Sequence, residues 1–196
     1  EMTRQGRRGA TVALYGHAAS PVKWDNMRFG ELFGGSRRRE NGVYEGLRNR
    51  ALNVTLVELG LEPDPEAPIH AVVMDTGYPE AVATFVCLRD GTVSLYLSTG
   101  GGVIGGGQQE SVRNACFEML SITNQYALDF IAASEPVSTF PLPRQGEVFF
   151  YLVTSDAVYQ ARCMEDALAE QRDPFSALFN NCHAVMSEVR EIEESR

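Results

Sequence analysis

Residues 98–107 read STGGGVIGGG, and six of these ten residues are glycine. A glycine-rich loop between a strand and a helix can hold phosphate groups with its backbone N–H groups. Gly100–Gly105 also match the G-x-G-x-x-G spacing of dinucleotide-binding loops. That chemistry requires a strand–helix–strand unit with an acidic residue about 20 residues further on. Because a long helix is expected to continue past that point, with Asp129 inside it, the pattern argues against a dinucleotide site.

A mononucleotide-binding loop needs a lysine that reaches the β- and γ-phosphates. Gln108 and Gln109 follow the last glycine, so this chemistry is disfavoured as well. Backbone amides at a helix N-terminus can nevertheless hold a small anion or metabolite without lysine. The alternative is that the glycines only allow strand and helix to pack closely, or that they lie at a subunit contact. The residues of the ligand hypothesis are Ser98, Thr99, Gly100, Gly101, Gly102, Gly105, Gly106, Gly107, Gln108, Ser111 and Arg113.

The cysteines and histidines suggest core positions instead of a reactive centre. None of the four cysteines forms a C-x-x-C pair, so we expect reduced thiols that pack as small hydrophobic side chains. Cys182 and His183 are adjacent on an expected helix, where neighbouring side chains diverge by about 100°. We therefore expect Cys182 in the core and His183 partly exposed. The three histidines show no H-x-x-x-H spacing, so no metal or other cofactor is expected.

The first expected strand carries a histidine and a carboxylate, two residue types that could act in catalysis. His70 and Asp75 lie five residues apart on one expected strand, which predicts opposite faces of a sheet. Residues 75–77 read Asp-Thr-Gly, the triplet of aspartic proteases, but that chemistry needs a second carboxylate and no second copy is present. We interpret this triplet as a turn and expect no catalytic role.

The N-terminal residues 1–42 are predicted to be a basic, poorly ordered arm. Residues 1–50 contain ten Lys or Arg against five Asp or Glu, whereas residues 51–196 contain seven against twenty-one. In FGELFGGSRRR, apolar side chains precede an arginine cluster, which could insert at an anionic membrane surface or dock on a partner. The residues of that hypothesis are Phe29, Leu32, Phe33, Arg37, Arg38 and Arg39.

Residues 43–196 are predicted to form one α+β domain. Apolar spacing predicts helices over residues 43–60, 108–133 and from 173 onward, with Gly60 as a C-cap and Asp173-Pro174 starting the last helix. Strands are expected within residues 69–77, 81–91, 92–99, 147–154 and 157–163, with hairpins at Asp90-Gly91 and Ser155-Asp156. Hairpin connections predict a mainly antiparallel five-stranded sheet with helices packed on it.

A family of small bacterial proteins is similar to this chain over roughly residues 43–194. The resemblance is carried by residues 77–107, with the glycine segment STGGGVIGGG, and by residues 149–163 and 173–190, and it implies no function. The order of helices and strands is also similar to profilin-like folds, among them Roadblock/LC7 domains. That similarity implies a homodimeric scaffold or a regulator of small GTPases, but the three expected strands before the long helix depart from the two of a Roadblock domain.

These observations favour a non-catalytic bacterial interaction or scaffold module, dimeric and binding a protein partner. The acidic body argues against nucleic acid. No apolar run approaches the ~20 residues that span a bilayer, and none resembles a secretion signal, so a cytoplasmic location is expected. The alternatives are a metabolite-binding or enzymatic domain that uses residues 98–113, and a peripheral membrane tether through the arm.

Overall fold

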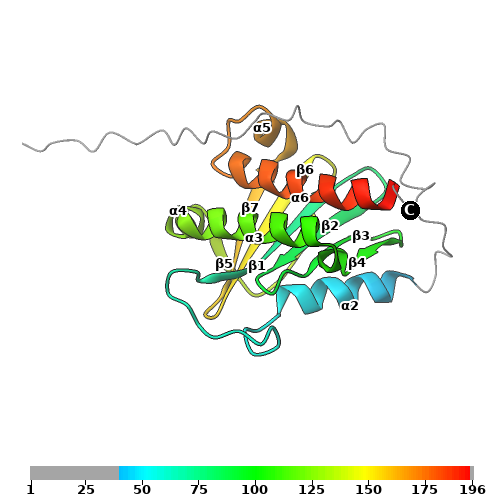
Figure 1. Cartoon of the computed structure of the whole chain (residues 1–196). Coiled ribbons are helices and arrows are strands. Elements are labelled where there is room, and N and C mark those ends of the chain that lie inside the picture. Colours follow the sequence, from blue (N-terminus) through cyan, green and yellow to red (C-terminus); the bar gives the residue numbers. More distant parts are fainter. Residues whose placement is uncertain (1–39, 195–196) are drawn as a thin grey trace, which may run out of the picture.

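The computed structural model describes residues 40–194 (Figure 1). One large sheet carries helices on both of its faces. The 3₁₀ helix η2 spans Gly106–Gln108 between β4 and α3. The order of the other elements is α2 (Glu40–Leu52), β1 (Ile69–Gly77), β2 (Val82–Leu88), β3 (Val93–Leu97), β4 (Gly102–Ile104), α3 (Glu110–Gln125), α4 (Ala127–Ala132), β5 (Glu135–Val137), β6 (Glu147–Thr154), β7 (Val158–Met164), α5 (Glu165–Ala169) and α6 (Ser176–Glu194).

Within residues 40–194 the sheet has seven strands in the order β4-β3-β2-β1-β6-β7-β5, and every neighbouring pair is antiparallel. The antiparallel α+β class is therefore confirmed, and all five expected strands are present. The predicted number of strands is wrong, because β4 and β5 add one three-residue strand at each edge. A three-residue strand is too short to show an alternating pattern, and β5 also contains Pro136, a residue that usually argues against a strand.

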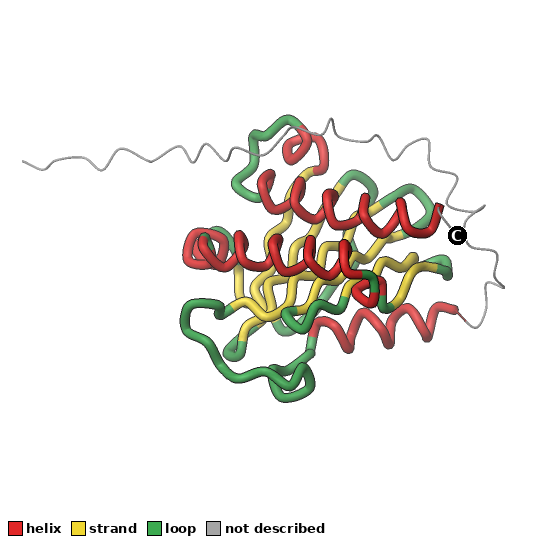
Figure 2. The backbone as a smooth tube through the Cα atoms, viewed as in Figure 1, coloured by secondary structure: helices red, strands yellow, loops and turns green. Residues whose placement is uncertain are grey.

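One face of the sheet is covered by α3 and α6, which run side by side across it (Figures 1 and 2). Met119 of α3 and Cys182 of α6 meet in this layer, with 3.7 Å between their sulfur atoms. The α6 helix is preceded by Asp173, whose Oδ1 accepts a hydrogen bond of 2.8 Å from the Phe175 amide, as the sequence predicts. The expected helix over residues 108–133 is interrupted at Tyr126 and forms α3 and α4.

The other face of the sheet is covered by α2. Tyr44, Ala51 and Leu52 of this helix pack against Val73 of β1 and Tyr151 of β6. The predicted helix over residues 43–60 is wrong at its C-terminal end, because α2 stops at Leu52.

A separate turn follows the end of α2 and explains why the helix does not continue. Here the Thr55 amide and hydroxyl both donate to Glu58, at 2.9 Å each. Gly60 still has the positive φ of 66° expected of a C-cap, but it closes this turn instead of a long helix.

The tight turns lie where the sequence predicts them, with two corrections. The Ser155-Asp156 hairpin is confirmed by the bond from the Thr154 amide to the Ala157 carbonyl. The β2–β3 connection has three residues instead of two, since Leu88 pairs with Thr92 and Gly91 takes a φ of 87°. The Asp-Thr-Gly triplet is not a turn, because residues 75–77 are the buried end of β1.

Candidate functional site

The glycine-rich segment does not run directly from a strand into a helix. Gly100 and Gly101 form the β3–β4 turn, Gly102–Ile104 are the edge strand β4, and η2 separates that strand from α3. The prediction of a simple strand-to-helix corner is therefore wrong. Positive φ angles of 100°, 83°, 144° and 74° at Gly100, Gly101, Gly102 and Gly105 explain the choice of glycine, since other L-residues rarely adopt them.

A groove lies between α2 and the β3–β4 hairpin, with a volume of about 220 Å³; we call it the α2 groove. The side chains that line it are almost entirely apolar. Two of them lie on its rim and are exposed, Val43 by 60% and Ile104 by 64%. Exposed aliphatic side chains that are grouped around a hollow make the groove a candidate for a binding surface. Its lining consists of Val43, Tyr44, Leu47, Tyr96, Leu97, Gly100, Gly101, Gly102 and Ile104.

A second hollow of about 240 Å³ lies on the other face of the sheet, beside the start of α3; we call it the α3 hollow. Val112 and Val189 form part of its wall, and both belong to the core under α3 and α6. Tyr44 and Tyr96 of the α2 groove belong instead to the core under α2. The two hollows therefore lie on opposite faces of the sheet edge, and Ile104 of β4 lines both.

A buried ion pair holds α2 on the sheet close to the α2 groove. The Nε and Nη2 atoms of Arg48 donate to Oδ2 of Asp75 at 2.8 and 2.6 Å. The Thr84 hydroxyl donates to Oδ1 of Asp75 at 2.6 Å. The Asp75 side chain is fully buried and that of Arg48 is 6% exposed. Burial raises the pKa of the Asp75 carboxyl, and the Arg48 guanidinium and the Thr84 hydroxyl oppose that rise.

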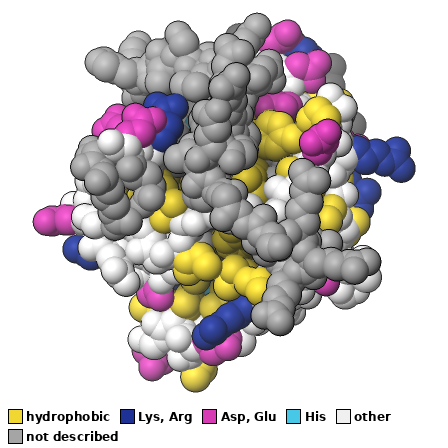
Figure 3. Space-filling view, turned by 90° about the vertical axis from the view of Figure 1, so that its right-hand side faces the viewer, with side chains coloured by type: hydrophobic (Ala, Val, Ile, Leu, Met, Phe, Trp, Pro, Cys, Tyr) yellow, Lys and Arg dark blue, Asp and Glu magenta, His cyan; other side chains and the backbone are white. Residues whose placement is uncertain are grey.

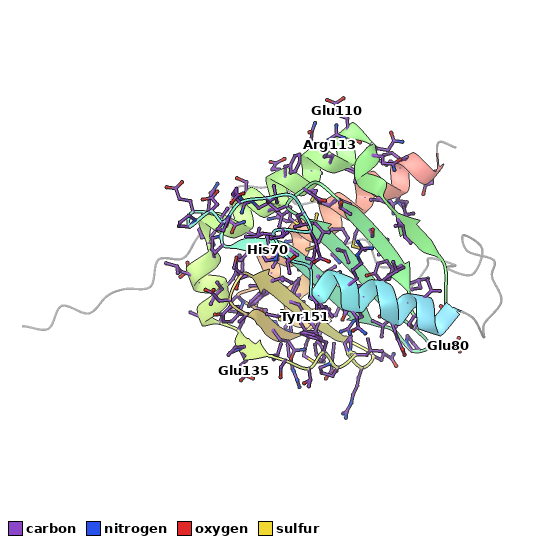
Figure 4. The ribbon with its side chains drawn as sticks, turned by 90° about the horizontal axis from the view of Figure 1, so that it is seen from below. His70, Glu80, Glu110, Arg113, Glu135 and Tyr151 are labelled. Carbon is purple, nitrogen blue, oxygen red and sulfur yellow. The ribbon has the colours of Figure 1, made fainter. Side chains whose placement is uncertain are left out.

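Tyrosine hydroxyls extend this network in two directions. The Tyr44 hydroxyl lies 2.9 Å from the Thr84 hydroxyl, and the Tyr44 ring meets the Tyr96 ring edge-on at 5.8 Å. The Tyr151 hydroxyl, beside α2 in Figure 4, donates to the Pro141 carbonyl at 2.8 Å and accepts from Gln160 at 2.8 Å. Burial raises the pKa of Tyr44 and of Tyr151 to about 12. These contacts tie α2, the four strands β2, β3, β6 and β7, and the loop before β6 together.

The network has a structural role because its charged groups are sealed from solvent. Both oxygens of Asp75 accept hydrogen bonds from within the protein, and Arg48 also donates to the carbonyls of Phe140 and Pro141. A carboxylate in this setting cannot exchange a proton with a substrate in the α2 groove. The expectation of no catalytic role for Asp75 is consistent with this geometry.

The prediction that His70 and Asp75 lie on opposite faces of the sheet is wrong, because β1 contains a bulge between them. The register between β1 and β6 shifts between Ile69 and Ala71, so one residue of β1 is extra at His70. The His70 Nε2 atom lies 2.9 Å from the Val54 carbonyl, on the face that α2 covers.

The eleven residues of the ligand hypothesis do not converge on one point. Gly100–Gly102 line the α2 groove, whereas Gly105, Gly106 and Gln108 line the α3 hollow. The Ser98 hydroxyl accepts a hydrogen bond of 2.8 Å from the Val82 amide, which holds β2 to β3. Thr99 and Ser111 are exposed.

The residues that lead into α3 already have internal partners. Arg113 donates to the Gly107 carbonyl at 3.2 Å, and the Gln108 and Gln109 amides donate to Gly105 and Gly106 at 3.0 Å each. Figure 4 shows Glu110 beside Arg113 at this end of the helix, and its carboxylate disfavours a bound anion there. An anion site at this position stays a prediction without a geometric argument in its favour.

The cysteine predictions are confirmed. Cys87, Cys116, Cys163 and Cys182 are free and buried. Burial raises the pKa of the Cys163 thiol to about 12, which removes the thiolate needed for nucleophilic chemistry. Within residues 40–194, no group of three or more His, Cys, Asp or Glu side chains is placed to hold a metal ion.

His183 gives a prediction for the pH dependence of stability. Its ring lies 4.2 Å from the Phe179 ring, and burial lowers its pKa to about 4. An unfolded chain binds the proton near pH 6.5, so stability is complete above that pH and falls as the pH decreases from about 6.5 to 4. The loss should be on the order of 3 kcal/mol. Urea unfolding between pH 4 and 7.5 measures it, and His183→Gln should remove this part of the slope.

The arm residues Phe29, Leu32, Phe33 and Arg37–Arg39 lie outside the described residues, so the membrane hypothesis stays a prediction. None of the helices in the described part of the chain combines the length and the apolar character needed to cross a bilayer.

Arg48 and Tyr44 were missed by the sequence interpretation, although a signal was present. Arg48 occupies the same helix face as Tyr44, Leu52 and Ala51, and an opposite charge, Asp75, interrupts an apolar strand. Two opposite charges at positions expected to be buried indicate a buried pair.

The α2 groove and the buried ion-pair network define the candidate site by the geometry of this chain alone. No family model, curated protein or solved structure matches the chain. The resemblances to a family of small bacterial proteins and to profilin-like folds therefore stay predictions.

Proposed function

We propose that the protein is a non-catalytic interaction module whose α2 groove receives apolar side chains of a protein partner. The observation that carries this proposal is the groove itself, an apolar hollow of about 220 Å³ with Val43 and Ile104 exposed on its rim. Aliphatic rim residues around a preformed hollow are the usual features of a protein-docking surface. Figure 3 looks onto this end of the molecule and shows apolar side chains at its surface with both acidic and basic side chains around them.

The absence of a reactive group in the groove supports a binding role over catalysis. Among residues 40–194, none that lines it is an acid, a base, a cysteine or a histidine. Its two tyrosines, Tyr44 and Tyr96, stay protonated near neutral pH, because burial raises the pKa of both. The nearby carboxylate, Asp75, is sealed beneath the groove. A second copy of the chain is one form of protein partner, which would make the module a homodimer.

We predict that Val43→Glu together with Ile104→Glu abolishes partner binding without unfolding the protein. Both side chains are exposed, so a glutamate at either site is hydrated in the free protein, but it would be buried in a complex. Crosslinking from position 99, an exposed residue of the β3–β4 turn next to the groove, identifies the partner in the native host, and sedimentation velocity reports self-association. The double variant should lose the crosslinked partner or the dimer.

The matched control is Val57→Glu together with Leu128→Glu. These side chains are 87% and 84% exposed and do not line either hollow. They receive the same change in charge and hydrophobicity, so the control should keep the partner. Equal binding by the wild type and by both double variants would contradict the proposal.

A further inference from the structure

We infer that the partner that fills the α2 groove is a second copy of this chain, bound through antiparallel pairing of β4 with β4 of the other copy. A two-fold axis at Val103 relates the two copies, so that the two sheets continue into each other. This inference rests on the proposed function, because it names the protein that the groove receives.

The first argument is the direction of the backbone groups in β4. Within residues 40–194, β4 has a hydrogen-bonded neighbour, β3, on one side only. The Leu97 amide donates to the Gly101 carbonyl across this pair, and the hydrogen-bonding direction alternates from residue to residue along a strand. Gly102 and Ile104 therefore turn their N–H and C=O groups away from β3. An edge of this kind can pair with another extended segment through backbone hydrogen bonds.

The second argument is that β4 is complementary to itself on the face that α2 covers. Gly102 pairs with Tyr96, which belongs to the core under α2, so Gly102 and Ile104 share that face. With the axis at Val103, Ile104 of each copy lies opposite Gly102 of the other. Gly102 lines the α2 groove and has no side chain, so it leaves room for the exposed Ile104 side chain. One strand therefore supplies both the projecting side chain and the space for it, as a two-fold interface requires.

The opposite face of this edge fits the same arrangement. Val103 packs against the core under α3 and α6 and lines the α3 hollow. On the two-fold axis it faces Val103 of the second copy as a pair without hydrogen bonds, in which the Cα atoms are about 4.5 Å apart. Aliphatic side chains at such directly opposed positions stabilise antiparallel sheets.

The third argument is charge. The chain carries a net charge of −9, so two copies repel each other unless they meet at an uncharged surface. Residues 92–109, which include β3, β4 and η2, contain no Asp, Glu, Lys, Arg or His. Edge strands that avoid pairing usually carry charged side chains or proline, and β4 carries neither. Its composition therefore allows two identical edges to approach each other.

Disulfide formation in the full-length chain tests the pairing and its register. In Val103→Cys, the two introduced thiols would face each other at a separation that a disulfide can span. We expect a covalent dimer in a glutathione redox buffer, at a yield at least about tenfold above that of Thr99→Cys. Thr99 is exposed in the same hairpin, but it lies four residues from the axis, so its two copies would be more than about 20 Å apart. The four native cysteines are buried, so the wild type gives the background.

Sedimentation velocity tests self-association without introduced thiols. Two paired three-residue strands form a small contact, so we expect a monomer–dimer equilibrium with a dissociation constant of about 1–100 µM. Val43→Glu with Ile104→Glu should raise this constant at least about tenfold, because the glutamates would be buried in the dimer. The control Val57→Glu with Leu128→Glu adds the same charge away from the edge and should leave the constant within about twofold of the wild type.

Two outcomes would overturn the inference. The first is a wild type that stays monomeric up to about 1 mM. The second is an equal yield of covalent dimer from Val103→Cys and Thr99→Cys, because random collision produces both without a defined register.

The same measurements separate this inference from the proposed function. Suppose that the wild type stays monomeric, and that crosslinking from position 99 captures a different protein that Val43→Glu with Ile104→Glu loses. The groove then binds a partner, and only the pairing of β4 with itself fails. If neither self-association nor a crosslinked protein is found, both proposals fail. A register-specific covalent dimer of Val103→Cys supports both.

Discussion

Replacing Asp75 with asparagine is expected to lower the free energy of unfolding by about 3–5 kcal/mol. The Arg48 guanidinium would remain buried, with its two short bonds to Oδ2 of Asp75 replaced by bonds to a neutral amide. A buried charge without its counter-charge retains the full cost of leaving water. Urea unfolding followed by circular dichroism measures the change. The matched control is Asp64→Asn, because Asp64 pairs with Arg89 at 3.5 Å with 44% of its side chain exposed.

The control should lose less than about 1 kcal/mol, since exposed pairs contribute little. Removing both buried charges gives a further check on the mechanism. Arg48→Met with Asp75→Leu should be closer in stability to the wild type than Asp75→Asn alone, because no unpaired charge remains. A loss below about 1 kcal/mol for Asp75→Asn would show that the network is not what holds α2 on the sheet.

Replacing Gly107 with alanine is expected to destabilise the protein by about 1–3 kcal/mol or more. A Cβ atom at this position would lie 1.9 Å from the Gly91 carbonyl oxygen, which belongs to the β2–β3 turn. Two backbone segments would have to separate to accept it, and β4 would move with them. Thermal and urea unfolding measure the loss of stability.

Gly106 is the matched control for this substitution, one residue earlier in the same glycine run. A Cβ atom there would find its nearest neighbour, the Val93 carbonyl oxygen, at 3.5 Å, which is ordinary contact. Gly106→Ala should therefore change stability by no more than about 0.5 kcal/mol. Equal effects of the two substitutions would contradict the close approach between Gly107 and the β2–β3 turn.

The comparison between Gly106 and Gly107 also shows the limit of the sequence interpretation. Both residues lie in the same run and were assigned the same role in a ligand-binding loop. Their difference depends on Gly91, sixteen positions earlier in the chain. Because no local pattern encodes that distance, the sequence could identify the loop but not the position that cannot accept a side chain.

The long elements were predictable because their signals are local. The apolar run of β1, the alternation of β3 and the helical spacing of Val112, Cys116 and Met119 each lie within one element. Asp173 and Ser155-Asp156 likewise act on residues one to three positions away. Local spacing decides which face of an element is apolar, so these elements and the antiparallel class follow from the residues alone.

The candidate site depends instead on contacts between distant residues. Arg48 meets Asp75 across 27 positions of sequence and Tyr151 across 103. The α2 groove forms only when α2 lies beside a hairpin that begins more than forty residues later. The sequence alone predicted a mixed α+β fold, buried thiols and an unusual glycine segment. Packing in three dimensions decided that this segment forms an edge strand between two hollows, because hydrophobic burial and ion pairing act on positions in space and not on neighbours in sequence.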